Sequence, residues 1–254
     1  MLQTLRDGMM ALEADRVDGT GYYALVPAAG SGTRMGSAQP KQYLEIAGKS
    51  MIAWSVQALL ACSRLDRVTV VLAPGDIWWS EAEWAHDIAS GRLQVLRCGG
   101  DTRAQSVTNG LTAMQLPDDA WVLVHDAARP CLEQDLIDRL IDTVGADAVG
   151  GLLAIPVADT LKRIGSGQRV SATVPREGLW LAQTPQMFRS GLLLRALKAR
   201  DGARMTDEAS AVEALGLSPL LVESRAGNFK VTWPDDLVLA RLRLAAAGKS
   251  KEGT

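Results

Sequence analysis

The chain has 254 residues and a formal net charge of −2, so no general basic surface indicates binding to nucleic acid. Hydrophobic residues make up 47% and no apolar run approaches ~20 residues, which is typical of a soluble globular protein without a transmembrane helix. Three scattered cysteines and two histidines exclude a disulfide framework and a multi-histidine metal site, and they fit a reducing cytoplasm.

Residues 1–21 precede the first predicted strand and are expected to form a flexible N-terminal extension outside the fold. Apolar residues recur at helical spacing between Leu2 and Leu12, and residues 18–21, DGTG, are typical of a linker. Charged residues interrupt this segment, so it does not have the apolar core of a secretory signal peptide.

A short apolar strand over 24–26 ends at Pro27 and leads into a loop of small residues, AAGSGT, over 28–33. Such a Gly-rich loop can bring its backbone N–H groups against a phosphate, because no Cβ atom stands in the way. Arg34 and Lys41 follow and would add two full positive charges. The pattern predicts a polyphosphate-binding loop; the alternative is an ordinary glycine turn with two solvated cations.

Spacing separates three kinds of phosphate loop. A Walker loop could end at 48–50, GKS, but its first glycine would fall on Tyr43. A dinucleotide fingerprint could use Gly30 and Gly32, but its third glycine would fall on Met35. What remains, AAG-x-G-x-R-M-G followed by PKQ, resembles the nucleotidyltransferase signature.

Helices over 51–60 and 75–89 are predicted to alternate with strands over 67–72 and 93–98. This order predicts an α/β fold whose sheet is mostly parallel and carries helices on both faces. Ligands of such sheets bind beyond the carboxyl ends of the strands, and the polar motifs of this chain fall there.

Two polar segments follow the third and fourth predicted strands. Residues 99–106, GGDTRAQS, open a helix and can present N–H groups to a ligand. Asp126 and Arg129 follow the strand 121–124; a carboxylate there is well placed for Mg²⁺, and Arg129 could bind a phosphate or hold Asp126. Helix capping or a salt bridge to Arg129 is the alternative for Asp126. For His125, a structural hydrogen bond is favoured over a catalytic role.

The second half of the chain departs from the alternation of strands and helices. After a helix over 133–144 and a strand over 148–157, a β-hairpin is predicted within an arm of about 158–178. An isolated two-stranded hairpin is marginally stable, so a second subunit is an economical packing partner. The remaining expected elements are a loop over 184–188, helices over 191–199 and after the caps Thr206 or Asp207, a strand over 220–225, a last helix from 234 to about 247 and a tail over 248–254.

These motifs together resemble one family, the 2-C-methyl-D-erythritol 4-phosphate cytidylyltransferases of the non-mevalonate isoprenoid pathway. In chain order they are PAAGSGTRMG…PKQYL, GGDTRAQSV, HDAARPC, DTLKR, TVPREGLWLAQTPQMF, TDEAS and NFKVTWPDDL. The resemblance covers about 22–247 and implies one Rossmann-like nucleotidyltransferase domain whose β-arm clasps a partner in a cytoplasmic homodimer.

The resemblance also implies roles for individual residues. It assigns catalysis to Arg34, Lys41 and Lys230, and a divalent cation, Mg²⁺ or another, to Asp126. The CTP site would comprise Ala28, Ala29, Gly30, Gly32, Gly100, Asp101, Arg103 and Ser106. The phosphate of a sugar-alcohol substrate would be bound by Thr160, Arg176 and Arg129, with the arm residues coming from the other protomer.

The implied reaction joins CTP and 2-C-methyl-D-erythritol 4-phosphate to give 4-diphosphocytidyl-2-C-methyl-D-erythritol and pyrophosphate. Ribitol 5-phosphate cytidylyltransferase is the nearest alternative, since it shares most of these motifs. An NAD-dependent oxidoreductase is a remote one, because Met35 breaks the required fingerprint. A catalytically silent nucleotide-binding module would lack the cations that are present here. One departure is Gly227, where family members often carry an acidic residue.

Overall fold

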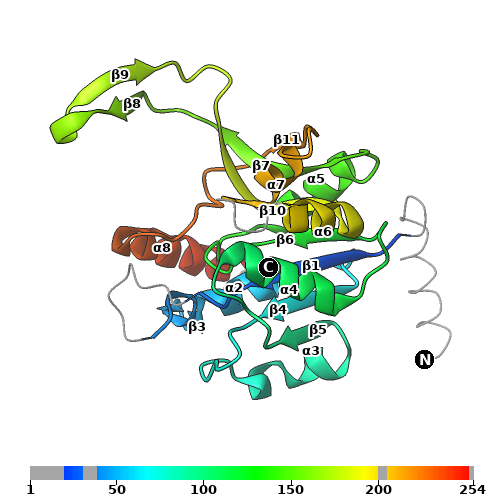
Figure 1. Cartoon of the computed structure of the whole chain (residues 1–254). Coiled ribbons are helices and arrows are strands. Elements are labelled where there is room, and N and C mark those ends of the chain that lie inside the picture. The colour runs from blue at the N-terminus through cyan, green and yellow to red at the C-terminus, as the bar shows by residue number, and fades with distance from the viewer. Residues whose placement is uncertain (1–19, 31–38, 200–204, 252–254) are drawn as a thin grey trace.

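A seven-stranded sheet forms the centre of the molecule, with strands in the order β11-β7-β10-β6-β1-β4-β5 (Figure 1). The structure, a computed structural model, describes residues 20–30, 39–199 and 205–251. The strands are β1 (Tyr22–Pro27), β4 (Arg67–Val71), β5 (Leu93–Leu96), β6 (Trp121–Val124), β7 (Gly150–Pro156), β10 (Trp180–Arg189) and β11 (Leu220–Glu223). All neighbours are parallel except β10, which is antiparallel to both β6 and β7. The predicted α/β fold with a mostly parallel sheet is confirmed.

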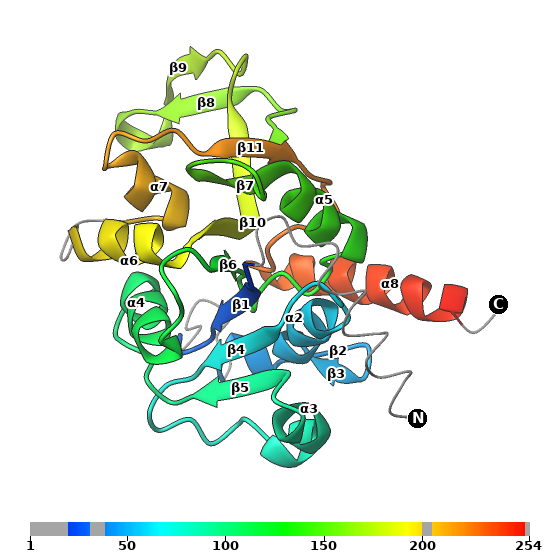
Figure 2. The same ribbon diagram turned by 90° about the vertical axis from the view of Figure 1, so that its right-hand side faces the viewer.

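Helices cover both faces of this sheet (Figure 2). One face carries α2 (Met51–Leu60) and α5 (Gln134–Val144), and the other carries α4 (Arg103–Met114), α6 (Ser190–Ala199) and α7 (Glu208–Glu213). The long helix α8 (Pro234–Lys251) lies beside α2. The shorter elements are η3 (Lys41–Tyr43), β2 (Glu45–Ile46), β3 (Lys49–Ser50), η4 (Glu81–Trp84) and α3 (Ala85–Ala89).

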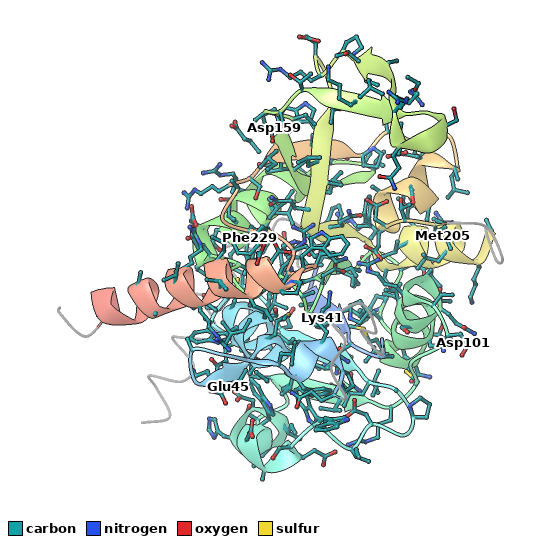
Figure 3. All side chains as sticks on the ribbon, turned by 90° about the vertical axis from the view of Figure 1, so that its left-hand side faces the viewer. Lys41, Glu45, Asp101, Asp159, Met205 and Phe229 are labelled. Atoms are coloured by element: carbon teal, nitrogen blue, oxygen red, sulfur yellow. The ribbon has the colours of Figure 1, made fainter. Side chains whose placement is uncertain are left out.

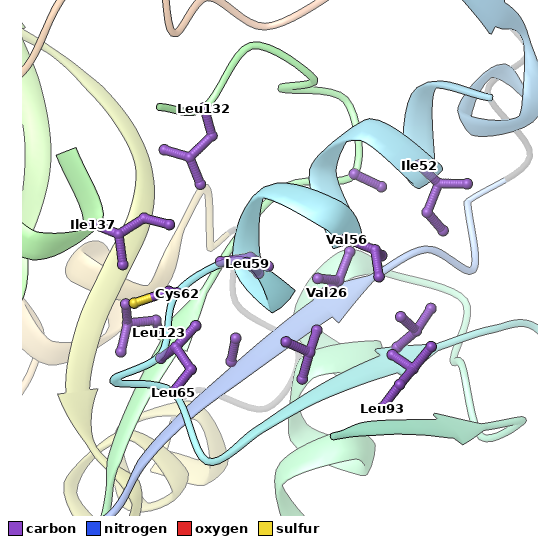
Figure 4. Close-up of a cluster of buried hydrophobic side chains, with 14 of the residues drawn as sticks. Val26, Ile52, Val56, Leu59, Cys62, Leu65, Leu93, Leu123, Leu132 and Ile137 are labelled. Atoms are coloured by element: carbon purple, nitrogen blue, oxygen red, sulfur yellow. The ribbon is translucent and has the colours of Figure 1, made fainter. Parts of the chain in front are cut away.

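On the α2 side, the core consists of apolar side chains of the helix that pack on apolar side chains of the central strands. Ile52, Val56 and Leu59 of α2 pack on Val26 of β1 and Leu123 of β6, and all five side chains are buried (Figure 4). Ser50 fixes the start of α2 by accepting a hydrogen bond from the N–H of Ala53. Each such aliphatic side chain contributes about 1.5–3 kcal/mol on burial.

On the opposite face, Gly110 lets α4 approach the sheet closely. A Cβ atom at this position would lie 2.6 Å from Val71 Cγ2 and 2.9 Å from Leu25 Cδ1. Glycine inside a helix costs roughly 0.5–1 kcal/mol relative to alanine, so the close packing offsets a real penalty. As a result, the first turn of α4 lies at the carboxyl ends of the central strands.

The predicted arm is a separate two-stranded sheet that projects from the molecule (Figure 1). It consists of β8 (Leu161–Ile164) and β9 (Val170–Val174), joined through η5 (Ser166–Gln168). The N–H of Val157 donates to the carbonyl of Leu179 at 3.0 Å, which closes the base of the arm.

Two expectations about secondary structure are wrong. Residues 184–188, expected as a loop, belong to β10, whose register against β7 shifts between Ala182 and Gln186. The expected helix over 75–89 is helical only from Glu81 onwards. Asp76 Oδ1 accepts hydrogen bonds from the N–H groups of Trp78 and Trp79, a local turn that competes with helix formation.

Most of the expected N-terminal extension lies outside the described residues, as does the end of the tail. Among the helices that the structure describes, none combines the length and the apolar character needed to cross a membrane.

Candidate active site

A cavity of about 500 Å³ opens at the carboxyl ends of β1, β5 and β6. Ten of the predicted site residues line it: Ala28, Ala29, Gly30, Lys41, Gly100, Asp101, Arg103, Ser106, Asp126 and Lys230. Two others, Gly32 and Arg34, lie outside the described residues. Another cavity, of about 450 Å³ beside α2, contains none of the predicted site residues that the structure describes.

The loop after β1 is held by Gln42, which sequence analysis did not assign to the site. Gln42 Nε2 donates to the carbonyls of Ala28 at 2.8 Å and Gly30 at 2.9 Å. Because C=O and N–H point in opposite directions across a trans peptide, this directs the N–H of Ala29 away from Gln42. The signal for Gln42 was its place in the PKQ motif.

The loop after β5 lies directly against the loop after β1. A Cβ atom on Gly99 would fall 2.2 Å from Ala29 Cβ, so only glycine permits this contact. The turn continues into α4, whose N-cap Thr102 accepts a hydrogen bond from the N–H of Gln105. Ser106 Oγ accepts from the N–H of Gly100 at 3.1 Å. This places the positive end of the α4 dipole beside the cavity, a favourable position for an anion.

Asp126 is the point where cations from distant parts of the chain meet. Its Oδ1 accepts from Arg103 Nε at 2.8 Å, and its Oδ2 accepts from Lys230 Nζ at 2.6 Å. Burial would raise the pKa of the Asp126 carboxyl, but the positive charges of Arg103 and Lys230 outweigh burial and hold that pKa well below its usual range. The sequence left open a salt bridge between Asp126 and Arg129. In the structure, the ion pairs of Asp126 are formed with Arg103 and Lys230 instead.

Lys41 enters the cavity from η3 and lies beside the segment that carries Lys230 (Figure 3). Its Nζ donates to the carbonyl of Val231 at 2.9 Å. The N–H of Val231 in turn donates to the carbonyl of Ala128 at 2.8 Å. The Lys41 side chain is therefore tied to the backbone next to Lys230, and that backbone is tied to the loop after β6.

His125 has a structural role, as the sequence favoured. Its Nε2 lies 3.2 Å from the carbonyl of Arg129, which can only accept, so Nε2 carries the proton. Nδ1 then accepts from Thr184 Oγ1 at 3.0 Å, and that oxygen accepts from the N–H of Asp126. Burial lowers the pKa of His125 to about 4, so the ring is neutral at pH 7.

Arg129 lines a smaller cavity of about 140 Å³, which shares Arg103, Asp126 and Lys230 with the larger one. It donates to the carbonyls of Asn228 at 2.7 Å and Ala182 at 3.2 Å. Its buried Nε has no hydrogen-bond partner among the described residues. The smaller cavity is therefore a polar extension of the larger one, lined by three cationic side chains and by the carboxylates of Asp126 and Asp207.

The two predicted site residues of the arm lie away from both of these cavities. Thr160 and Arg176 are both exposed, and Arg176 donates to the carbonyl of Ala158. Neither lines the larger cavity or its extension. Figure 3 shows Asp159, the neighbour of Thr160, far from Lys41 in the same chain.

Glu208 is a second residue whose place in the site was not predicted. It is 1% exposed, and its two oxygens accept from Arg103 Nη1 at 2.6 Å and Nη2 at 3.0 Å. The TDEAS segment indicated only a helix cap, and Asp207 does form a capping box with Ser210 at the start of α7. No signal in the segment itself indicated the burial of its glutamate.

The donor set for a metal ion is sparse. Asp101 and Asp126 are the carboxylates that line the larger cavity, and no cluster of three or more metal-ligating side chains occurs in the described part of the chain. At Gly227, an added Cβ atom would lie 2.3 Å from Arg243 Cζ, so a guanidinium fills the space near that position. Mg²⁺ commonly uses one or two carboxylates together with substrate phosphates, so a cavity with Asp126 and Asp101 is compatible with this ion.

Comparison with known proteins places the chain among relatives of one name. The family model described as 2-C-methyl-D-erythritol 4-phosphate cytidylyltransferase matches residues 22–246. Proteins of that name from Laribacter hongkongensis and Nitrosospira multiformis are 62% and 56% identical; the alignments cover 89% and 88% of this chain and 98% and 97% of those proteins.

Solved structures show the same likeness. A crystal structure of 4-diphosphocytidyl-2C-methyl-D-erythritol synthase superposes with a TM-score of 0.78 at 42% identity, covering 89% of this chain and 99% of the other. The 2-C-methyl-D-erythritol 4-phosphate cytidylyltransferase of Francisella tularensis gives a TM-score of 0.74 at 33% identity, covering 88% and 100%.

Proposed function

The chain belongs to the 2-C-methyl-D-erythritol 4-phosphate cytidylyltransferase family, and from this we propose how its own residues carry out the reaction. The enzyme joins CTP and 2-C-methyl-D-erythritol 4-phosphate to give 4-diphosphocytidyl-2-C-methyl-D-erythritol and pyrophosphate. An oxygen of the acceptor phosphate attacks the α-phosphorus of CTP, and the bond to the β-phosphate oxygen breaks. That acceptor oxygen is already ionised at pH 7, so no side chain has to remove a proton.

The larger cavity is the proposed CTP site. The observation that carries this assignment is that Lys41, Lys230 and Arg103 line one cavity at the ends of the parallel strands, where Lys230 and Arg103 pair with Asp126. Two polyanions repel one another, and these cations hold them together and stabilise charge that develops on the transferred phosphoryl group. The loop at 28–30 and the first turn of α4, with Gly100, Asp101 and Ser106, supply N–H and polar groups for the nucleotide. Gly32 and Arg34 remain part of the proposal on the motif alone.

Asp126 is the proposed ligand of Mg²⁺ or another divalent cation. A bound cation would neutralise charge on the triphosphate oxygens. For Asp126 to take part, Lys230 or Arg103 must give up its contact with the carboxylate. Lys230 is the more exposed of the two partners, with 43% of its side chain accessible against 28% for Arg103, so Lys230 is placed to reach phosphate oxygens. Arg103 has Glu208 as a second charged partner and can leave Asp126 without losing every ion pair.

The acceptor phosphate is proposed to bind at the smaller cavity, where Arg129 offers a buried guanidinium with an unpartnered Nε. We further propose that Thr160 and Arg176 reach this site from the arm of a second chain in a homodimer. Two observations support that assembly: both residues lie away from the cavities of their own chain, and Ile164 and Val170 on the arm are 68% and 63% exposed. Exposed apolar side chains on a projecting hairpin are typical of an interface.

The proposed setting is the cytoplasm, because all three cysteines are free thiols, as expected in a reducing compartment.

Pyrophosphate release from CTP and Mg²⁺ tests the acceptor. We expect release with 2-C-methyl-D-erythritol 4-phosphate and little with ribitol 5-phosphate or without acceptor. Faster release with ribitol 5-phosphate would favour the alternative cytidylyltransferase, and no release with either would contradict the assignment of this cavity to catalysis.

A further inference from the structure

Glu208 and Asp126 share one guanidinium, and they share it unequally. Glu208 accepts from both terminal nitrogens of Arg103, at 2.6 and 3.0 Å, whereas Asp126 accepts only from Nε, at 2.8 Å. A bidentate pair of this kind fixes the plane of the guanidinium as well as its position. Arg103 can therefore lose its contact to Asp126 and still keep two charge-assisted hydrogen bonds.

The position of Glu208 is itself fixed by β10. Gln186 is 1% exposed; its Oε1 accepts from the N–H of Ala209 at 2.8 Å, and its Nε2 donates to Asp207 Oδ2 at 2.9 Å. These two bonds hold the residues on either side of Glu208. Glu208 is therefore a fixed anchor, and Arg103, which reaches it from α4, is the part that would adjust.

The charges around Asp126 explain why an anchor matters. Arg103 and Lys230 contact the Asp126 carboxylate, and Arg129 lines the cavity beside it. Without Glu208, Arg103 would keep Asp126 as its remaining ion-pair partner among the described residues. A divalent cation would then compete with Arg103 for Asp126 at the cost of leaving a partly buried guanidinium without a charged partner.

We propose that Glu208 is a positioning residue that retains Arg103 and so allows Asp126 to exchange its Arg103 contact for a divalent cation. The inference rests on the proposed role of Asp126. Glu208 does not touch the cation or the nucleotide in this proposal; it acts through Arg103.

Mn²⁺ is the probe for this proposal. Water-proton relaxation enhancement reports Mn²⁺ in the enzyme–CTP complex, because Mn²⁺ bound to the protein tumbles more slowly than Mn²⁺–CTP in solution. We expect Glu208→Gln to weaken Mn²⁺ binding in that complex by about 10- to 100-fold. We expect the matched variant Glu213→Gln, at an exposed position on the same helix, to leave it within about twofold. In turnover assays, added Mg²⁺ should restore much of the kcat of Glu208→Gln.

An Arg103→Gln background distinguishes the anchoring of Arg103 by Glu208 from a general effect of losing one negative charge. If Glu208 acts through Arg103, Glu208→Gln should cause no further loss of Mn²⁺ binding in Arg103→Gln. The double variant removes both charges of this pair, so Mn²⁺ binding that falls well below that of Arg103→Gln would overturn the proposal even if Glu208→Gln alone fails to fold. An equal loss in both backgrounds, or no loss in Glu208→Gln, would overturn the proposal.

Asp126→Asn tests the premise separately. Loss of Mn²⁺ from the enzyme–CTP complex in this variant supports the role of Asp126. Unchanged Mn²⁺ binding would remove both the proposed metal ligand and the inference built on it. If Mn²⁺ binding is lost in Asp126→Asn but not in Glu208→Gln, the proposed role of Glu208 is rejected and the proposed role of Asp126 stands.

Discussion

At Asp126, side chains from α4 and from the segment before α8 reach a single carboxylate at the end of β6. The preceding residue, His125, is buried and neutral, and it ties the same loop to β10 through Thr184. The two neighbours thus differ in kind: one faces the cavity and carries charge, and the other faces the protein and fixes the loop. The HDAARPC motif contains both residues. The carbonyl of Arg129 can only accept a hydrogen bond, so the ring of His125 donates to it and has a structural role.

Lys41 should be needed for turnover and not for folding. Lys41→Ala removes one full positive charge from the cavity, and we expect kcat/KM to fall about 100- to 1,000-fold. Lys49→Ala is the control, since Lys49 is exposed and contacts Gln57 and the Trp54 ring outside the cavity. Circular dichroism should be unchanged in both, and a near-normal rate for Lys41→Ala would refute its assignment.

His125 should make the protein sensitive to mild acid. Its pKa is about 4 in the folded state and about 6.5 when unfolded, so the unfolded chain binds more protons between these values. This contribution to stability is complete above about pH 6.5 and is lost as the pH falls, by roughly 2–3 kcal/mol at pH 4.5. Asp126 adds its own loss only below about pH 4.

Urea unfolding at pH 7.5 and pH 4.5 measures this effect. We expect His125→Gln to be less stable than the parent protein at pH 7.5 but to lose less free energy of unfolding on acidification. An identical pH dependence in both proteins would show that His125 does not control it.

At the level of elements, strands and helices with a simple apolar pattern were predictable, and those organised around polar contacts were not. The buried runs of β1, β4 and β6 follow from Val and Leu in short segments. β10 was missed because Thr184 and Gln186, which look like loop residues, are buried and bond to His125 and α7. The place of Glu208 depends on Arg103, 105 residues away, so no local pattern encodes it.

Gln186 should therefore contribute to stability through α7. Gln186→Ala leaves the buried N–H of Ala209 without its partner, and we expect a loss of about 1–3 kcal/mol in the free energy of unfolding. Gln134→Ala, at the exposed start of α5, should change it by less than about 0.5 kcal/mol. Urea denaturation of the two variants compares them directly; equal stabilities would mean that α7 is held by other contacts.

At the level of the whole molecule, the proposed dimer divides the active site between two chains. The cavities of one chain contain Lys41 and Arg129, while Thr160 and Arg176 lie on the arm and outside both cavities. Motifs indicated all of these residues. Which of them belong to one site was beyond sequence analysis, because that depends on how two folded chains meet.

Complementation tests this division. Lys41→Ala and Arg176→Ala homodimers should each be nearly inactive, whereas mixed dimers should contain one site with both residues intact and regain about a quarter to a half of the parent activity per dimer. Mixing should be done by co-expression with two affinity tags, so that only heterodimers are measured. No recovery would mean that each chain supplies its own Arg176.

The hydrogen bond between Val157 and Leu179 shows how the arm is joined to the sheet, and this determines how freely the arm can change in evolution. Because it joins the two ends of the arm as neighbours in adjacent antiparallel strands, residues 158–178 are an insertion into an otherwise complete β-hairpin. A short turn could replace them with little change in the register of β7 or β10. Lineages could therefore lengthen, shorten or exchange the arm while inheriting the nucleotide site unchanged, so that assembly and chemistry are open to separate selection.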